Sequence, residues 1–274
     1  MMFDANTLSP DTRLEADICI IGGGAAGITT ALALEGTGLR VLLLEGGALV
    51  GDEQSQSLYE GENLGLDLTS MSEARLRMLG GSTNHWAGNC MRLEPIDFEA
   101  REGIEYSGWP ITLADVEPYY LRAQELVETP NDAAYDTPER LARLEAVPLD
   151  FAPDLLKTHL YAESPPTLFG LAYEADLEAA QDVGCYLHAN ALELLTSDDA
   201  SRVTSVRMAS LSGTPFTVSA RRVIVATGGM EVPRLLLLSN STAAAGLGNT
   251  NDLVGRFFMD HIAVRPSLTA LIGD

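Results

Sequence analysis

Residues 17–27 read DICIIGGGAAG, an apolar run followed at once by three glycines and, three residues later, by a fourth. The spacing of Gly22, Gly24 and Gly27 is the G-x-G-x-x-G pattern of a strand that turns tightly into a helix. In such a unit Gly22 permits the turn, Gly24 lets the backbone approach a phosphate, and Gly27 lets helix and strand pack closely. The N-terminus of the helix would offer free amides and a partial positive charge to a pyrophosphate.

A second apolar run completes the pattern. Residues 39–45 read LRVLLLE, and Glu45 ends this run about 20 residues beyond the glycines, where a dinucleotide-binding unit places its acid. A carboxylate there accepts hydrogen bonds from both ribose hydroxyls of an adenosine and disfavours a 2′-phosphate, so NADP is a poor candidate. Both runs are short and unbroken, as buried parallel strands are. The motif predicts a dinucleotide site but does not separate FAD from NAD.

A third apolar run bears on that choice. Residues 222–229 read RVIVATGG, and the run ends in Ala226, Thr227 and Gly228. Flavoproteins of the glutathione-reductase-like type place such a strand beside the first glycine loop, which favours FAD. Taken alone, the run fits an ordinary buried strand with a glycine turn equally well.

The remaining pattern indicates how the fold is completed. Three strands of a meander that returns to the main sheet are expected at 185–196, 202–211 and 216–226. Helices are expected at 113–127, 174–183 and 231–239. Thr112 is placed to cap the first of these helices. The predicted fold class is α/β, a Rossmann-like FAD-binding domain with a glutathione-reductase-like βαβ unit and a β-meander.

The composition excludes several classes of partner. The chain has 274 residues with 39 acidic and 17 basic side chains, for a net charge of −22. Such a surface repels phosphate backbones and anionic lipid, so neither nucleic acid nor a membrane is expected as a partner. No apolar run reaches the ~20 residues that span a bilayer, and residues 1–17 lack a signal-peptide pattern, so we expect a cytoplasmic protein. Cys19, Cys90 and Cys185 are scattered without a C-x-x-C pair, which is typical of reduced thiols and predicts no metal site.

Four further stretches together resemble the glucose-methanol-choline (GMC) oxidoreductase family. The resemblance is to its bacterial branch related to pyranose oxidase and sugar dehydrogenases, and it runs from about residue 15 to 266. The stretches are GGSTNHWAG at 80–88, SGWP at 107–110 with EPYY at 117–120, GGMEVPRLLL at 228–237 and DLVGRFFMDH at 252–261. Their order and spacing make coincidence a poor explanation.

The resemblance implies where FAD would bind. In such proteins the GGST-type loop passes beneath the isoalloxazine ring, so Gly80, Gly81 and Ser82 would contact the flavin. Arg77 would lie near the pyrophosphate, where a guanidinium can bond two phosphate oxygens. Leu192 would meet the edge of the adenine through its backbone.

The same resemblance makes His85 a candidate for a covalent link to the flavin. In pyranose oxidase the histidine of a Ser-Thr-His-Trp stretch carries the flavin covalently, and His85 before Trp86 falls at the matching position, with Asn84 where that motif has threonine. A covalent link through His85 and a non-covalent contact of Asn84 and His85 with the flavin both stay open, as does a simple packed pair of His85 and Trp86. We expect Glu231 to cap the helix that follows the third apolar run, with direct contact to the cofactor as the alternative, and His261 to be structural.

The resemblance also implies a division of the chain. GMC enzymes have a chain about twice as long, with a substrate domain interleaved with the flavin domain and a histidine base near the C-terminus, so the substrate domain is expected to be incomplete and no catalytic residue is named. We predict an FAD-binding domain in two parts, a partial substrate-domain or insertion segment between them, and the start of a truncated substrate domain. The two parts of the FAD-binding domain span 15–130 and 185–262. The segment between them spans 131–184, and the start of the truncated substrate domain spans 263–274.

The expected function is oxidation of an alcohol CH–OH group, of a sugar or sugar-like substrate, by hydride transfer to flavin N5. The alternative is a non-catalytic flavin-binding fragment, or half of a split enzyme that needs a C-terminal partner chain. A homo-oligomer and several classes of electron acceptor stay open. A nicotinamide-dependent dehydrogenase is disfavoured, because it needs neither the GGSTNHW loop nor the second glycine-ended strand.

Overall fold

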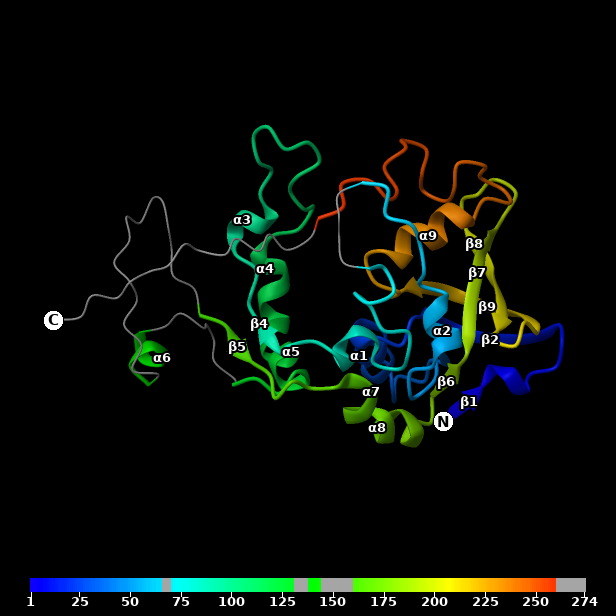
Figure 1. The fold of residues 1–274 in the computed structure, drawn as a ribbon, viewed down its shortest axis with the longest axis horizontal. Helices are drawn as coiled ribbons and strands as arrows, with labels where there is room; N and C mark the ends of the chain where they lie inside the picture. The colour runs from blue at the N-terminus through cyan, green and yellow to red at the C-terminus, as the bar shows by residue number, and fades with distance from the viewer. Residues whose placement is uncertain (66–69, 131–137, 144–159, 260–274) are drawn as a thin grey trace.

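One seven-stranded sheet organises the protein (Figure 1). The computed structural model describes residues 1–65, 70–130, 138–143 and 160–259. His261 and the predicted segment 263–274 lie outside these residues. In spatial order the strands are β1 (Met2–Asp4), β6 (Val183–Leu187), β3 (Val41–Leu44), β2 (Thr12–Ile21), β9 (Pro215–Val225), β8 (Val203–Ser210) and β7 (Ala189–Thr196).

The parallel half of the sheet contains the predicted βαβ unit. β2 pairs in parallel with β3 on one side and with β9 on the other, so the three apolar runs of the sequence are neighbours. Alternate residues of β2 enter two different cores: Ile20 packs on one face of the sheet, and Cys19 and Ile21 on the other. All three are buried. The prediction of a Rossmann-like α/β fold is confirmed.

The two faces of the sheet are covered differently. On the face of Ile20, the core includes residues of α1 (Ala25–Ala33), α7 (Phe169–Ala172) and α8 (Glu174–Ala179). On the opposite face, strands of the meander and α9 (Glu231–Leu238) form the second core. The predicted helix at 174–183 is shorter than expected, because Val183 already belongs to β6.

The predicted strand at 185–196 is wrong as one element. Val183–Leu187 is β6 in the parallel half, whereas Ala189–Thr196 is β7, antiparallel to β8. His188 lies between them with a positive φ of 55°, a left-handed conformation that turns the chain. Its N–H donates to the Gly47 carbonyl at 2.9 Å. β7, β8 and β9 therefore form the antiparallel meander that the sequence predicts.

A smaller lobe lies beside the main sheet (Figure 1). β4 (Asn89–Cys90) pairs antiparallel with β5 (Ala162–Glu163), which joins two segments that the sequence assigned to different domains. The predicted helix at 113–127 is divided by a 3-10 turn, and a hydrogen bond of 2.7 Å from the Thr112 N–H to Asp115 completes a capping box at its start. Its parts are α4 (Leu113–Val116), η3 (Glu117–Tyr119) and α5 (Tyr120–Leu126).

The other short elements are α2 (Glu53–Ser57), α3 (Pro95–Phe98), α6 (Pro138–Arg143), η1 (Ala5–Thr7) and η2 (Gly81–Asn84). Among the residues with a described position, no helix is both long and apolar enough to cross a bilayer. The same residues contain no group of three or more histidine, cysteine or acidic side chains arranged to hold a metal ion.

Candidate functional site

A cavity of about 640 Å³ opens at the carboxyl ends of β2, β3 and β9. Open α/β sheets bind ligands at this edge, and the volume lies within the range of small-molecule and cofactor sites. The lining comes from the turn before α1, the end of β3, Tyr59, the segment 74–77, the loop 80–83, β7, the residues that follow β9, and residues 258–259. Segments far apart in the sequence thus meet around one space.

The first glycine turn has the geometry that a phosphate needs. Gly22 has φ of +105°, and a Cβ built on it would lie 2.5 Å from the Ala226 carbonyl oxygen. A Cβ on Gly27 would lie 1.8 Å from the Gly22 carbonyl oxygen, so α1 packs on the turn only without a side chain there. Gly24, by contrast, lines the cavity and faces open space, and it begins α1 without a side-chain cap. The N-terminus of α1 is therefore open to a ligand.

Glu45 is held at the end of β3 by backbone amides. Its side chain accepts hydrogen bonds from the Gly23 N–H at 2.7 Å and from the Gly47 N–H at 2.8 Å. Burial raises the pKa of Glu45, although these amides and the charge of Arg77 act in the opposite direction. The carboxylate lines the cavity with lone pairs to spare, as recognition of ribose hydroxyls requires.

Two buried polar atoms of the cavity wall lack a protein partner. Arg77 donates from Nη2 to Asn190 Oδ1 at 2.6 Å, but its Nε has no hydrogen-bond partner among the described residues. Thr227 Oγ1 is likewise buried without a hydrogen-bond partner in the part of the chain that the structure describes. Both residues line the cavity, and buried donors of this kind are normally satisfied. The wall therefore fits a ligand that carries hydrogen-bond acceptors, as the diphosphate and ribose of FAD do.

The second glycine loop is fastened to the first by its backbone. The Gly80 N–H donates to the Gly23 carbonyl at 2.7 Å. Gly80 has φ of +90°, and a Cβ on it would lie 2.5 Å from the Gly170 nitrogen. Asn84 shapes the loop from below, since its Nδ2 donates to the carbonyls of Leu79 and Gly81, each at 2.9 Å. The loop thereby presents its backbone to the cavity.

The structure brings most of the predicted cofactor residues to the cavity. Those in the lining are Gly22, Gly24, Glu45, Arg77, Gly80, Gly81, Ser82, Ala226, Thr227 and Gly228. Gly27 and Asn84 stand behind the wall in the supporting positions described above. Leu192 does not line the cavity: it sits at a β-bulge with 43% of its surface exposed, and Ala189 and Ala191 line the space instead.

His85 is also outside the lining. It is exposed and follows η2, and the Nε1 of neighbouring Trp86 donates to the Thr167 carbonyl at 3.0 Å. This contact packs the Trp86 side chain, whereas His85 is exposed. The covalent role of His85 stays a prediction.

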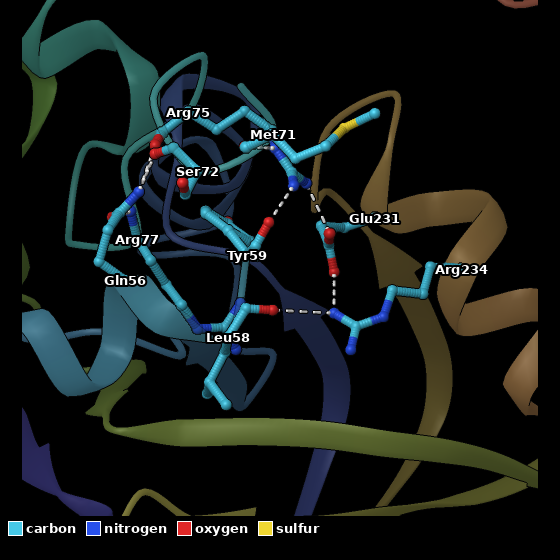
Figure 2. A network of polar contacts seen from close by, with 9 residues as sticks. All are labelled: Gln56, Leu58, Tyr59, Met71, Ser72, Arg75, Arg77, Glu231 and Arg234. Carbon is cyan, nitrogen blue, oxygen red and sulfur yellow. Dashed lines mark hydrogen bonds and ion pairs between the residues drawn. The ribbon is translucent and has the colours of Figure 1, made fainter. Parts of the chain in front are cut away.

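Four polar residues of the lining were not predicted as site residues: Thr83 and, as Figure 2 shows, Tyr59, Arg75 and Glu231. Glu231 does not cap α9, contrary to expectation, because Met230 is the N-cap residue and this cap makes no side-chain hydrogen bond. Its carboxylate instead pairs with Arg75 at 2.5 Å and with Arg234 at 3.0 Å. Only the spacing of three between Glu231 and Arg234 could have indicated part of this arrangement from the sequence.

Cavity and fold together define a dinucleotide-binding α/β domain. Residues 17–243 match the FAD dependent oxidoreductase (DAO) family, and the chain belongs to that family. The cofactor is therefore FAD, which resolves the choice that the glycine motif left open.

Particular relatives are more distant. The chain is 26% identical over 325 residues to the fructose dehydrogenase large subunit of Gluconobacter japonicus, with 90% of this chain and 59% of the relative covered. It is 25% identical to 2-methyl-1,2-propanediol dehydrogenase of Mycolicibacterium austroafricanum, with 90% and 55% covered. The chain thus spans a little over half the length of these curated relatives.

Solved structures share the fold. Pyridoxine 4-oxidase from Mesorbium loti superposes with a TM-score of 0.52 at 20% identity, over 81% of this chain and 51% of the other. A formate oxidase superposes with a TM-score of 0.51 at 16% identity, over 85% and 48%. At this level of identity the likeness concerns the fold alone.

Proposed function

We propose that this chain is the FAD-binding portion of a GMC-type oxidoreductase that oxidises the CH–OH group of a sugar or sugar-like alcohol. The observation that carries the proposal is the meeting, at one cavity, of the first glycine turn, residues 80–83 of the GGSTNHW loop and the Ala-Thr-Gly residues that follow β9. The names of two relatives support the substrate class, since one is a dehydrogenase of fructose and the other of a diol. A 122-residue match at 35% identity to 6'''-hydroxyparomomycin C oxidase of Streptomyces lividus, a short one, agrees.

In this proposal different residues of the cavity bind different parts of FAD. Glu45 accepts from the ribose hydroxyls, the N-terminus of α1 and Arg77 hold the diphosphate, and the backbone of 80–82 supports the flavin ring. Bound FAD supplies the acceptor of the substrate's hydride at N5. No histidine with a described position lines the cavity, so the base that removes the hydroxyl proton is not assigned to these residues.

The division into domains is part of the proposal. The proposed FAD-binding parts at 15–130 and 185–262 contain most of the strands of the sheet, which β1 and the start of β2 extend back to Met2, but 15–130 also includes β4 and α3–α5, which are not part of that sheet. The lobe of β4, β5 and α3–α5 lies outside that sheet and is the candidate for the segment nearest the substrate (Figure 1).

An absorbance spectrum of the purified chain, before and after acid precipitation, tests the cofactor assignment. We expect a flavin spectrum with FAD. Colour that stays with the pellet, and is lost in His85→Ala, would establish a covalent link through His85. Colour released to the supernatant would establish non-covalent FAD. A chain that cannot be loaded with FAD at all would contradict the proposal.

Reduction of the bound flavin under anaerobic conditions tests the substrate class. Fructose and 2-methyl-1,2-propanediol are the first probes, and we expect bleaching of the flavin band by at least one of a panel of sugars and alcohols. The control is dithionite, which reduces any accessible flavin. A flavin that dithionite reduces and no alcohol reduces would favour the alternative, a flavin-binding chain that requires a partner, as the name "large subunit" of one relative suggests.

A further inference from the structure

A group of four side chains, which we call the latch, joins two walls of the FAD cavity (Figure 2). Its members are Tyr59, Arg75, Glu231 and Arg234. Arg75 and Glu231 are 156 residues apart in the chain, and their side chains are only 16% and 14% exposed. Because both line the cavity, their contact fixes the distance between the segment after α2 and the start of α9.

Arg75 is oriented from every side. Its guanidinium lies 4.0 Å from the centre of the Tyr59 ring, in a cation–π contact. Its Nε donates to the Met71 carbonyl at 3.1 Å, and its Nη2 donates to the Tyr59 carbonyl at 3.4 Å. The remaining direction is taken by the Glu231 carboxylate. Arg75 therefore has one defined position, and Glu231 is its anionic partner.

A second connection runs in parallel. Arg234 donates from Nη1 both to the free carboxylate oxygen of Glu231 at 3.0 Å and to the Leu58 carbonyl at 3.3 Å. The carboxylate of Glu231 is thus shared by two arginines, one from each wall. Loss of its charge would weaken both connections at once.

The latch is also connected to Arg77, whose Nε has no hydrogen-bond partner among the described residues. Gln56 donates to the Arg75 carbonyl at 2.7 Å and accepts from the Arg77 N–H at 2.9 Å. The backbone from Arg75 to Arg77 is therefore held as one piece, and Arg77 lies 5.1 Å from the same Tyr59 ring. A shift of Arg75 would move Arg77, which lines the cavity and whose buried Nε has no hydrogen-bond partner among the residues with a described position.

We propose that Glu231 is a positioning residue for FAD: through Arg75 and Arg234 it holds the segment 56–77 against α9 and so retains the cofactor. The inference rests on FAD occupying this cavity. Glu231 acts through the arginines and not as a group of the reaction.

The test is the rate of FAD release from Glu231→Gln, measured by flavin fluorescence after dilution. Every variant also carries His85→Ala, so that the flavin can leave whether or not His85 carries it in the native protein. We expect release roughly tenfold faster than from His85→Ala alone, as loss of a charge-assisted hydrogen bond predicts. The matched control is Glu193→Gln, which removes the charge of another Arg-paired, buried carboxylate that does not line the cavity. It should leave the release rate unchanged.

A double-mutant cycle with Arg75→Gln separates positioning from a general loss of stability. If the latch acts as a unit, Glu231→Gln in the Arg75→Gln background should add much less than tenfold to the release rate. Additive effects, or equal effects of Glu231→Gln and Glu193→Gln, would overturn the proposal. A His85→Ala protein that never binds FAD would instead contradict the cofactor site itself.

Hydrogen exchange of the FAD-loaded protein gives a second measurement. We expect faster exchange in 56–65 and 70–77 of Glu231→Gln, with β2 unchanged. If Glu231→Gln does not fold, Arg234→Gln, which keeps the Arg75–Glu231 pair, is the milder variant, and a two- to threefold faster release is expected. Unchanged exchange and release in the folded variant would contradict the latch.

Discussion

Two buried glutamates show how differently the chain treats polar groups. Glu193, on β7, accepts from the Ser241 N–H at 2.9 Å and pairs with Arg207 at 2.5 Å. Hydrogen bonds from Ser241 and the charge of Arg207 lower the pKa of Glu193. At Glu45 the balance is reversed, since burial raises the pKa of that carboxyl above its ordinary value. One carboxylate is fully matched by the protein, and the other is not.

The surroundings repeat the contrast. At the junction of β7 and α9, Ser239 Oγ donates to the Leu235 carbonyl at 2.7 Å and accepts from the Leu194 N–H at 2.9 Å. At the cavity, Arg77 Nε and Thr227 Oγ1 are buried without partners. At the junction the polar groups bond one another and stabilise the fold, whereas at the cavity some of them are left without a protein partner and can bond a ligand. Changes at the junction should alter stability, and changes at the cavity should alter FAD affinity.

Gly27→Ala should break both regions together and have the largest effect. The new Cβ would lie 1.8 Å from the Gly22 carbonyl oxygen, so α1 must move away from the glycine turn. We expect a loss of about 4 kcal/mol or more in the free energy of unfolding, measured in urea, with no FAD binding. Gly65→Ala, where a Cβ would meet nothing within 4 Å, is the control. A stable, flavin-loaded Gly27→Ala protein would refute the packing role of this glycine.

Glu193→Gln should affect the junction alone. Its side chain is buried, but Arg207 is 55% exposed and solvent weakens the pair, so we expect a loss of about 2 kcal/mol in the free energy of unfolding. FAD affinity, measured by titration of the flavin-free protein, should stay within about twofold, since Glu193 does not line the cavity. A large loss of affinity at unchanged stability would reverse the comparison.

Gly24→Val should affect the cavity alone. A Cβ at Gly24 meets no protein atom within 4 Å, and its φ of −79° suits any residue, so the thermal midpoint should hardly change. The side chain would occupy the space before the N-terminus of α1, and we expect FAD affinity to fall up to about a hundredfold. If affinity is retained, the diphosphate does not bind at this helix terminus.

Thr227→Val sharpens the contrast at a single atom. Removing a buried hydroxyl that lacks a partner should raise the free energy of unfolding of the flavin-free protein by about 1 kcal/mol and weaken FAD binding by a similar amount. Thr196→Val is the matched control, because its Oγ1 is also buried and unpartnered but lies away from the cavity. It should gain the stability without losing affinity. Equal affinities would show that Thr227 does not face the cofactor.

The smallest expected effect is a difference in pH dependence. The pKa of Glu193 is lowered from 4.5, so its contribution to stability is present above pH 4.5 and is lost as the pH falls below it. The pKa of Glu45 is raised from 4.5, so ionisation costs stability as the pH rises above 4.5. In flavin-free protein, the free energy of unfolding of the native chain minus that of Glu193→Gln should therefore rise with pH. The same difference taken with Glu45→Gln should fall with pH. Parallel slopes would contradict the assignment.

The sequence is informative where function requires a local pattern. Gly22, Gly24 and Gly27 act through backbone geometry within one turn, so their spacing predicts both the βαβ unit and its open helix terminus. It is uninformative where a contact joins distant segments. Arg75 lies in a polar, turn-rich stretch without periodicity, and only the folded chain brings it to Glu231.

Backbone conformation explains the other misses. The left-handed turn at His188 divides one apolar run into two strands, and no glycine marks the position. The bulge between Ala191 and Glu193 shifts the register of β7, which leaves Leu192 exposed and Ala191 in the lining. A one-residue shift of this kind changes which face a side chain occupies, and the residue pattern does not report it.

The hydrogen bond between the Gly80 N–H and the Gly23 carbonyl joins the two glycine loops through peptide groups alone. No change of side chain removes such a bond, except a proline at position 80, which has no N–H to donate. A residue larger than glycine at position 23 or 80 would disturb the bond indirectly, because its Cβ would crowd the neighbouring atoms. The relative placement of the two loops can therefore survive wide drift in the surrounding residues, so long as both positions remain glycine.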